Sequence, residues 1–385
     1  MNKVIVFGGA HYNTLGIIRS LGKRGLSVVC ILHTSNLKEA SLRFSKYVTV
    51  LHHVESVDEG LQLLRTTYIN DVEKPILLFS SDAAVLAVDS CYEELKAHFS
   101  FFNAKGKISY YMDKVNTFPI AEQCGLRLIK TWQKGANGSW PSDIHFPCLI
   151  KGENSTTSTK ACMRVCYNGE ELSAYLSSEG NYLLQEYIEK EYEINVVGFA
   201  YNGGKKIFIP SVIRKIRDEM HRQSVYMRMD KLTDYPLLDL QTIEKFIDKL
   251  GYEGIFSVEF LYKNGIYYFL EINMRNDGCG YFYTAAGVNY PWLWVQYCLG
   301  REISKDITKI DVKTPYYLIS FDDVKNMLEG KVSFFRWIYS LITANAYFVF
   351  DLKDPLPFCY SMLIHIRQGL KLIFNKILKR KMSNG

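Results

Sequence analysis

The chain has 385 residues, 48% of them hydrophobic and 22% charged, which is an ordinary globular composition and enough for two or three domains. Its nine cysteines include no CxxC pair, which argues against a disulfide or zinc framework and predicts reduced thiols. The net charge of +6 is concentrated after Asp354, where six Lys or Arg residues and no acid occur. The rest of the chain is therefore neutral overall, and we expect no general nucleic-acid surface.

The sequence gives no sign of a targeting or membrane-spanning segment. The N-terminus MNKVIVFGGA is typical of a first β-strand and not of a signal peptide. The most apolar stretch, residues 334–350, is interrupted by Arg336 and Asn345, so we expect a buried helix there and not a membrane span. These features predict a cytoplasmic protein.

The first 105 residues or so alternate between strand-like and helix-like segments, which predicts a parallel α/β domain. The expected strands are 3–7, 26–32, 47–53 and 75–82, and the expected helices lie at 17–25, 56–68 and 84–99. The first turn is rich in glycine, but it lacks GxGxxG, and no acid follows the second strand. A nicotinamide cofactor is therefore not expected.

The next 190 residues mix helices with hairpins, which predicts a separate α+β region. The expected helices are 112–126, 169–178 and 239–254, and the expected strands are 146–152, 182–204 with an acidic elbow, 207–216 and a hairpin at 256–273 with Asn-Gly at its tip.

The end of the hairpin carries the pattern most suggestive of chemistry. Glu271, Asn273 and Arg275 alternate along an apolar strand, and Glu259 lies on the preceding strand. Two carboxylates and an amide oxygen are ligands that Mg²⁺ prefers. A strict two-residue turn would point Glu271 away from Glu259, so a metal site predicts an odd-numbered loop or a bulge. The alternative is a solvated edge strand with incidental acids.

Two lysines have surroundings that suit phosphate. Lys114 begins a predicted helix, and Lys151 ends an apolar strand before a loop rich in Ser and Thr, residues 153–161. Small hydroxyl residues let a loop approach an anion and close over it. Either lysine alone would be read as solvent-exposed, but the acidic hairpin favours a phosphate site.

The order of five segments resembles the ATP-grasp superfamily, in particular stand-alone carboxylate–amine ligases similar to carbamoyl-phosphate synthase and D-aspartate ligase. The segments are DK at 113–114, FPCLIKG at 146–152, LLQEYIEKEYEINV at 183–196, VEF at 258–260 and FLEINMR at 269–275. The resemblance implies a Rossmann-like pre-ATP-grasp domain at 1–110 and a two-lobed ATP-grasp domain at 111–300, with lobes at 111–182 and 183–300. Residues 301–385 would form a helical C-terminal extension.

The resemblance also implies roles for individual residues. Lys114 and Lys151 would contact the ATP phosphates, and Lys151 also the adenine. Gln185, Glu186, Tyr187 and Ile188 would read the adenine edge, and Glu193 would bind the ribose, with Glu191 as its rival. Glu259, Glu271 and Asn273 would hold Mg²⁺ or Mn²⁺, and Arg275 would face the γ-phosphate and an acyl phosphate. This chain departs from the pattern in its phosphate loop, which lacks the usual glycines, and in Glu189-Lys190, which replace the usual Pro-Gly.

The implied reaction joins a small-molecule carboxylate to an amine with ATP, and we expect it to belong to envelope or surface-polysaccharide synthesis. Phosphorylation of a small carboxylate such as bicarbonate, and a non-catalytic ATP-binding scaffold, remain alternatives. Arg214, with Lys215, could hold a substrate carboxylate, and Arg228 and residues 276–280 are further candidates. Residues 357–381 alternate Leu or Ile with basic residues, which predicts either a helix docked on the anionic inner face of a membrane or one packed on the protein.

Overall fold

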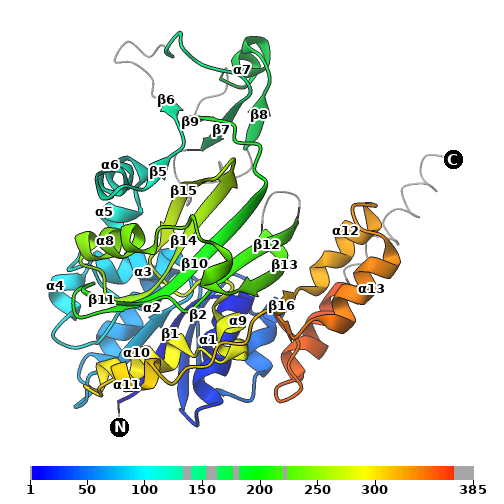
Figure 1. The fold of residues 1–385 in the computed structure, drawn as a ribbon. Coiled ribbons are helices and arrows are strands. Elements are labelled where there is room, and N and C mark those ends of the chain that lie inside the picture. Colours follow the sequence, from blue (N-terminus) through cyan, green and yellow to red (C-terminus); the bar gives the residue numbers. More distant parts are fainter. Residues whose placement is uncertain (1, 133–139, 153–162, 177–181, 220–222, 368–385) are drawn as a thin grey trace, which may run out of the picture.

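The computed structural model describes residues 2–132, 140–152, 163–176, 182–219 and 223–367 (Figure 1). Within these ranges, no helix combines the length and apolar character needed to cross a bilayer. The elements form three sheets with helices packed around them.

The N-terminal layer is a parallel sheet in the order β3-β2-β1-β4, as the alternating sequence predicts. β1, β2 and β4 are almost entirely apolar and buried, as expected where helices cover both faces, whereas the edge strand β3 is partly exposed. The strands are β1 (Val4–Gly9), β2 (Val28–His33), β3 (Val48–Val54) and β4 (Ile76–Phe79). The helices are α1 (Tyr12–Gly22), α2 (Val57–Leu63), α3 (Asp82–Asp89) and α4 (Tyr92–Leu95), so α1 begins earlier than expected and the helix expected at 84–99 is two helices.

The small lobe is a four-stranded sheet with a hydrophobic core of its own. Its order is β6-β9-β7-β8, and α7 (Gly169–Leu176) packs beside β8. The strands are β6 (Thr131–Trp132), β7 (Cys148–Gly152), β8 (Arg164–Cys166) and β9 (Tyr182–Glu186). Its core includes Trp132, Ile150 and Leu184 and is separate from the main core, so this lobe packs as a distinct unit (Figure 1).

The large sheet has nine strands and carries the acidic hairpin. Its order is β17-β16-β13-β12-β10-β14-β15-β5, with β11 paired to β10. The strands are β5 (Arg127–Leu128), β10 (Tyr192–Tyr201), β11 (Lys206–Phe208), β12 (Val212–Glu219), β13 (Gln223–Asp230), β14 (Gly254–Lys263), β15 (Ile266–Asn273), β16 (Tyr316–Ile319) and β17 (Ala346–Tyr347). The last two strands come from the C-terminal extension, which was expected to be helical.

Helices flank the large sheet and begin and end at the residues that helix chemistry favours. α6 starts after Asp113, which caps Val115 N, and ends at Gly125, which adopts the left-handed conformation with φ 104°. α8 ends in the same way at Gly251. The helices are α5 (Ile108–Met112), α6 (Lys114–Cys124), α8 (Leu240–Leu250), α9 (Gly280–Ala286), α10 (Tyr290–Cys298), α11 (Ser304–Ile307), α12 (Val324–Leu328) and α13 (Phe334–Thr343).

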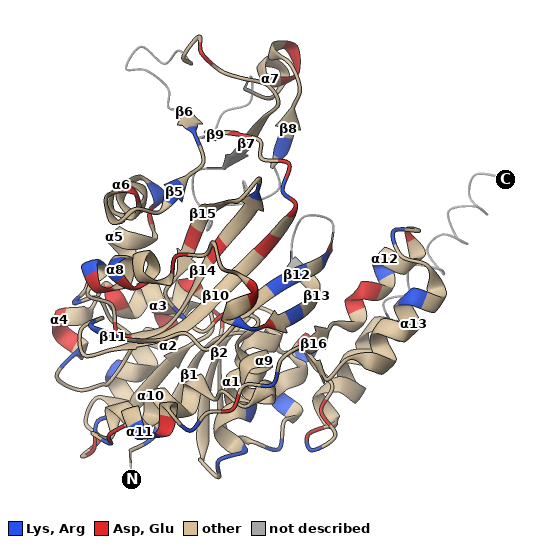
Figure 2. Ribbon diagram, in the orientation of Figure 1, with Lys and Arg blue, Asp and Glu red and all other residues tan. Residues whose placement is uncertain are grey.

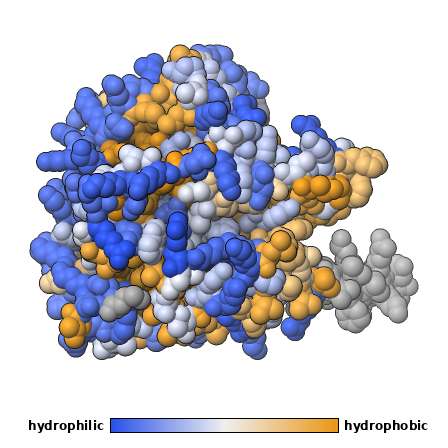
Figure 3. All heavy atoms as spheres, turned by 60° about the horizontal axis from the view of Figure 1, so that its bottom comes forward, coloured by the Kyte–Doolittle hydropathy of each residue, from blue (hydrophilic) through white to orange (hydrophobic). Residues whose placement is uncertain are grey.

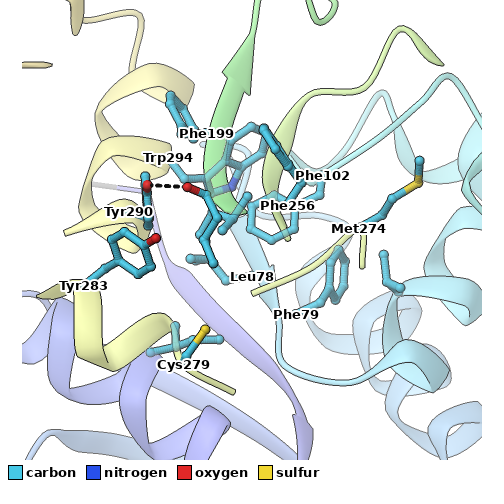
Figure 4. Packing of buried hydrophobic residues seen from close by; sticks show 14 of the residues in the cluster. Leu78, Phe79, Phe102, Phe199, Phe256, Met274, Cys279, Tyr283, Tyr290 and Trp294 are labelled. Carbon is cyan, nitrogen blue, oxygen red and sulfur yellow. Dashed lines mark hydrogen bonds between the residues drawn. The ribbon is translucent and has the colours of Figure 1, made fainter. Parts of the chain in front are cut away.

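One continuous core joins the N-terminal sheet to the large sheet. Figure 4 shows Leu78 and Phe79 of β4, Phe199 of β10 and Trp294 of α10 in the same buried cluster. Trp294 Nε1 donates to Leu77 O at 3.1 Å, and Met274, at the end of β15, is fully buried in this core. The segment that follows Met274 is therefore held between the two sheets.

Candidate active site

The hairpin places both acids on one face through a bulge. Asn264 and Gly265 form a two-residue turn with positive φ at both positions, so Lys263 pairs with Ile266. The register shifts by one residue before Glu259, which pairs directly with Glu271 and leaves Leu270 as the extra residue. The prediction of a bulge is confirmed. Two carboxylates therefore project together from adjacent strands.

Amide groups extend the oxygen-rich cluster on either side of Glu259. Asn273 Nδ2 donates to Glu259 Oε1 at 3.3 Å, and Asn195 Nδ2 lies 3.5 Å from the same oxygen. The Oδ1 atom of buried Asn195 has no hydrogen-bond partner among the described residues. A buried acceptor without a donor is costly, and a cation beside it would satisfy it.

The donor set fits a hard divalent cation that is completed by a ligand. Within the described ranges, no three His, Cys, Asp or Glu side chains gather into a ready-made metal site. Two carboxylates and neighbouring amide oxygens make a partial shell, which is how Mg²⁺ is bound when phosphate oxygens supply the remaining positions.

Each cation near the hairpin is paired with one of these acids or with a neighbour. Lys215 Nζ is 2.7 Å from Glu259 Oε2 and also contacts Glu193, while Lys114 Nζ is 3.0 Å from Glu271 Oε2. Figure 2 shows acidic positions on β10, β14 and β15 and basic positions on β12 below the small lobe. The acidic cluster is thus neutralised by internal ion pairs.

Burial and pairing shift the pKa values of this cluster. Burial raises the pKa of Glu259 to about 7, although Lys215 opposes the rise and Glu271 adds to it. Burial alone would lower the pKa of Lys215, but Glu259 and Glu193 outweigh burial and raise it. Burial alone would raise the pKa of Glu193, but Lys215 and Lys190 outweigh burial and lower it. One protonated ammonium is therefore shared by two carboxyl groups.

Arg275 links the hairpin to the N-terminal layer. Its Nε is 2.5 Å from Asp82 Oδ1, and its Nη2 donates to Asn273 Oδ1 at 3.1 Å. The next residue, Asn276, donates from Nδ2 to Asn13 Oδ1 at 2.5 Å. Sequence reasoning missed Asp82 and Asn13. Asp82 is the first residue of α3, which follows β4, and Asn13 is the second residue of α1, which follows β1. Ligand sites of parallel sheets lie at such strand-to-helix connections.

The structure does not bring Arg214 to this cluster. On β12, Lys215 pairs with Glu193 while Arg214 pairs with Ile194, so the two basic side chains lie on opposite faces. The Arg214 guanidinium lies over the ring of Tyr192 at 4.2 Å. Arg228 is the cross-strand partner of Arg214 and shares its face. Of the pair proposed to hold a substrate carboxylate, only Lys215 faces the acids.

In the segment from Gln185 to Ile188, which connects the small sheet to the large sheet, some polar groups already form hydrogen bonds within the protein. Gln185 is buried, and its Nε2 donates to Thr131 Oγ1 at 2.9 Å. Glu186 N donates to Lys130 O and Tyr187 N to Pro147 O, so these two amides are used within the fold. An adenine edge would thus meet the carbonyls of this segment or the amide of Ile188, which is half-buried.

The two candidate ribose acids have different surroundings. Glu193 lies beside Lys215 and Lys190, next to the cluster. Glu191 Oε1 accepts from Asn264 N at the hairpin tip, at 2.9 Å. This arrangement favours Glu193 over its rival.

The phosphate-loop expectation falls mostly outside the described residues. Lys151 belongs to β7, where its backbone pairs with Leu183, but its side chain and the loop at 153–162 are not among the described parts. Residues 276–280, offered as an oxyanion site, form a turn in which Cys279 N donates to Asp277 Oδ1 at 3.1 Å and Gly280 N to Asp277 O.

Comparisons with known proteins agree with this geometry. Residues 179–316 match the family model described as "ATP-grasp in the biosynthetic pathway with Ter operon". A D-aspartate ligase from Enterococcus faecium (strain Aus0004) is 23% identical over 325 residues, which is 73% of each chain.

Solved structures share the fold at low sequence identity. An ADP complex of N5-carboxyaminoimidazole ribonucleotide synthetase gives a TM-score of 0.65 at 12% identity, covering 86% of this chain and 85% of that one. An L-amino acid ligase from Bacillus licheniformis gives 0.61 at 16% identity, covering 81% and 78%.

Proposed function

We propose that this chain is an ATP-grasp ligase of the carboxylate–amine type, which activates a carboxylate with ATP and joins it to an amine; the family match over residues 179–316 supports the assignment. The observation that carries the proposal is the direct pairing of Glu259 with Glu271 beside Asn273. The names of its relatives, a D-aspartate ligase and an L-amino acid ligase, support a small-molecule carboxylate and an amine as substrates.

Glu259, Glu271 and Asn273 would hold Mg²⁺ or Mn²⁺. A cation held there would supply positive charge that neutralises the charge developing during phosphoryl transfer. The oxygen donors and the unpartnered Asn195 Oδ1 support this assignment.

Lys114, Lys215 and Arg275 would neutralise the phosphates. Each now contacts a carboxylate, Glu271, Glu259 or Asp82 respectively. Phosphate oxygens bound beside these cations would compete with the carboxylates for them and would leave oxygens of Glu259 and Glu271 for a cation. Protein work in this reaction is mainly positioning and electrostatic stabilisation of an acyl phosphate.

The segment from Gln185 to Ile188 would bind the adenine, with Glu193 on the ribose and Lys151 on the phosphates. The position of this segment between the two sheets supports the assignment, because the nucleotide would then lie between the small lobe and the acidic hairpin.

The test is ADP release across a panel of carboxylates and amines, with the Glu271→Gln variant beside the native chain. We expect ADP only when a suitable carboxylate and amine are both present. Glu271→Gln should lower the rate about a hundredfold, because a metal ligand is lost. Glu191→Gln is the matched control, since Glu191 lies at the hairpin tip, and it should turn over normally.

Other outcomes separate the alternatives. ADP release with a carboxylate alone, bicarbonate included, would instead indicate a carboxylate-phosphorylating enzyme. Measurable binding of magnesium nucleotide without ADP from any pair would indicate a scaffold and contradict the ligase proposal.

We further propose that the substrates belong to envelope or surface-polysaccharide synthesis, and that residues 357–381 associate with an anionic membrane from the cytoplasmic side. The absence of acids after Asp354 supports the second point, because each Lys or Arg near an anionic surface contributes about 1 kcal/mol. The membrane association can be measured by sedimentation of the full chain with anionic vesicles, and added salt should weaken it.

A further inference from the structure

The outer face of α13 exposes a stripe of large apolar side chains. Phe335, Tyr339 and Ile342 recur at spacings of four and three and are 83%, 68% and 76% exposed. The neighbouring Phe334 is 53% exposed. The expectation of a buried helix in this stretch is therefore wrong for this face. An amphipathic helix normally turns such a stripe inward.

A second stripe lies on the helical segment 356–367. Leu356, Leu363 and Ile366 are 59%, 63% and 55% exposed, at spacings of seven and three. Figure 1 shows α12 and α13 projecting from the side of the molecule at which the described chain ends. Figure 3 shows hydrophobic atoms gathered on this projecting part.

Two aromatic contacts fix the second helix to the body. The ring of Phe358 lies 4.8 Å from that of Phe321, and the ring of Tyr360 lies 4.4 Å from that of Phe44. Tyr360 also donates to Lys38 O at 2.7 Å. Tyr360 lies four residues after Leu356 and three before Leu363, so it fixes the edge of the stripe, whereas Phe358 lies on the other side of the helix. The exposed side chains cannot turn inward without breaking these contacts.

Exposed cations outnumber exposed acids around the two stripes, because Glu329 is the one exposed acid among the described residues 320–367. Between residues 320 and 367 the exposed cations are Lys325, Lys331, Arg336, Lys353 and Arg367. Of the five acids in this range, four already form ion pairs: Asp323 with Arg217, Glu329 with Lys331, Asp351 with Lys23 and Asp354 with Arg19. A self-paired dimer would bring like charges opposite one another, whereas an anionic surface would complement them.

We propose that this face docks on an anionic lipid surface. The platform consists of Phe334, Phe335, Tyr339 and Ile342 on α13 and Leu356, Leu363 and Ile366 on the following helix. Its apolar residues protrude on helices instead of lining a groove, and aromatic and aliphatic side chains ringed by Lys and Arg are typical of interfacial helices. The platform rests in part on the proposed membrane association of residues 357–381, with which it shares Leu363 and Ile366; α13 and Leu356 extend that surface, and it is separate from the ATP site.

The experiment measures binding of the full chain to vesicles of phosphatidylglycerol mixed equally with phosphatidylcholine, and to phosphatidylcholine alone. The variant Phe335→Ser/Tyr339→Ser/Ile342→Ser should bind the anionic vesicles on the order of a hundredfold more weakly, because three buried apolar groups are lost from the lipid contact. The matched control Val72→Ser/Leu237→Ser removes apolar groups that are 103% and 61% exposed elsewhere, and it should bind like the native chain.

Further measurements keep the platform and the ligase proposal separate. Both variants should keep the native unfolding midpoint and the native response to magnesium nucleotide, since the substituted side chains are exposed. Native-level vesicle binding by the triple variant overturns the platform, as does a loss of binding confined to a tail variant with Lys376, Lys379, Arg380 and Lys381 changed to Gln. A native dimer that the triple variant dissociates, or capture by soluble polyglutamate with no vesicle binding, also overturns it.

Discussion

Lys215 is the side chain whose role depends most on its exact neighbours. It contacts both Glu193 and Glu259, and its own side chain is only 14% exposed. The Lys215 ammonium therefore neutralises the carboxylates that would otherwise attract a metal ion. The nucleotide-free protein should therefore bind free metal poorly, and metal should enter with the nucleotide.

Changing Lys215→Met should make binding of free Mn²⁺ tighter, on the order of tenfold, because two buried carboxyl groups lose their internal counter-ion. Turnover should fall, since the proposed phosphate contact of Lys215 would be lost. Titration of Mn²⁺ by electron paramagnetic resonance without nucleotide measures the first effect. Lys190→Met is the control, because Lys190 is 38% exposed and its ion pairs within the described residues are with Glu193 and Asp218, not with Glu259 or Glu271. Equal Mn²⁺ binding by native and Lys215→Met proteins would contradict the argument.

Sequence reasoning could not separate Lys215 from Arg214. The two are adjacent on one strand, so they necessarily face opposite sides, but which side meets the acids depends on pairing with β10. Asp82 was missed for a similar reason, because its contact with Arg275 joins residues 193 positions apart. The hairpin acids were predictable because the alternation of polar residues in an apolar strand is local.

At the scale of elements, the hairpin could be predicted from the sequence, but the position of its bulge could not. Asn264-Gly265 specified the turn, and the need to bring Glu259 and Glu271 together predicted a bulge or a longer loop. The position of the bulge at Leu270 follows from tertiary packing, since Phe260 and Phe269 pair and are both buried in the core. The strands β16 and β17 were missed because their pairing partners lie far away along the chain.

Two single-residue deletions in β15 should differ sharply in their effect on binding of magnesium nucleotide. Deleting Leu270 removes the extra residue and leaves Phe269 opposite Phe260 and Glu271 opposite Glu259, so binding of magnesium nucleotide should change by less than about threefold. Deleting Ile272 moves Asn273 and Arg275 to the opposite face and should abolish binding. The shift in melting temperature on addition of magnesium nucleotide measures binding by both deletion variants. Loss of binding on deletion of Leu270 as complete as on deletion of Ile272 would rule out the register argument.

At the scale of the whole molecule, the C-terminal extension is fastened to the N-terminal layer. Arg19 and Asp354 form a buried ion pair at 2.9 Å, and Asp354 also accepts from Ser45 Oγ at 2.7 Å. Lys23 Nζ lies 2.6 Å from Asp351 Oδ2, which also accepts from the Tyr281 hydroxyl. These contacts hold the base of the lipid-docking platform on the α/β layer.

The contribution of Asp351 should depend on pH in a defined way. Burial alone would raise its pKa, but Lys23 and the Tyr281 hydroxyl outweigh burial and lower it. A carboxyl whose folded pKa lies below the unfolded value of about 3.9 adds stability above that value and loses it as pH falls through the folded pKa. Asp351→Asn should therefore lower the free energy of unfolding by on the order of 1 kcal/mol at pH 7.

Denaturant unfolding of native and Asp351→Asn proteins should show the same difference from pH 7 down to about 4.5, because Asp351 stays ionised in both folded and unfolded chains over that range. Glu329→Gln is the matched control, since the Glu329–Lys331 pair is 38% and 49% exposed and should contribute almost nothing. A difference that decays between pH 7 and 5 would mean that Asp351 titrates above its ordinary range, and Lys23 and Tyr281 would then not stabilise the carboxylate.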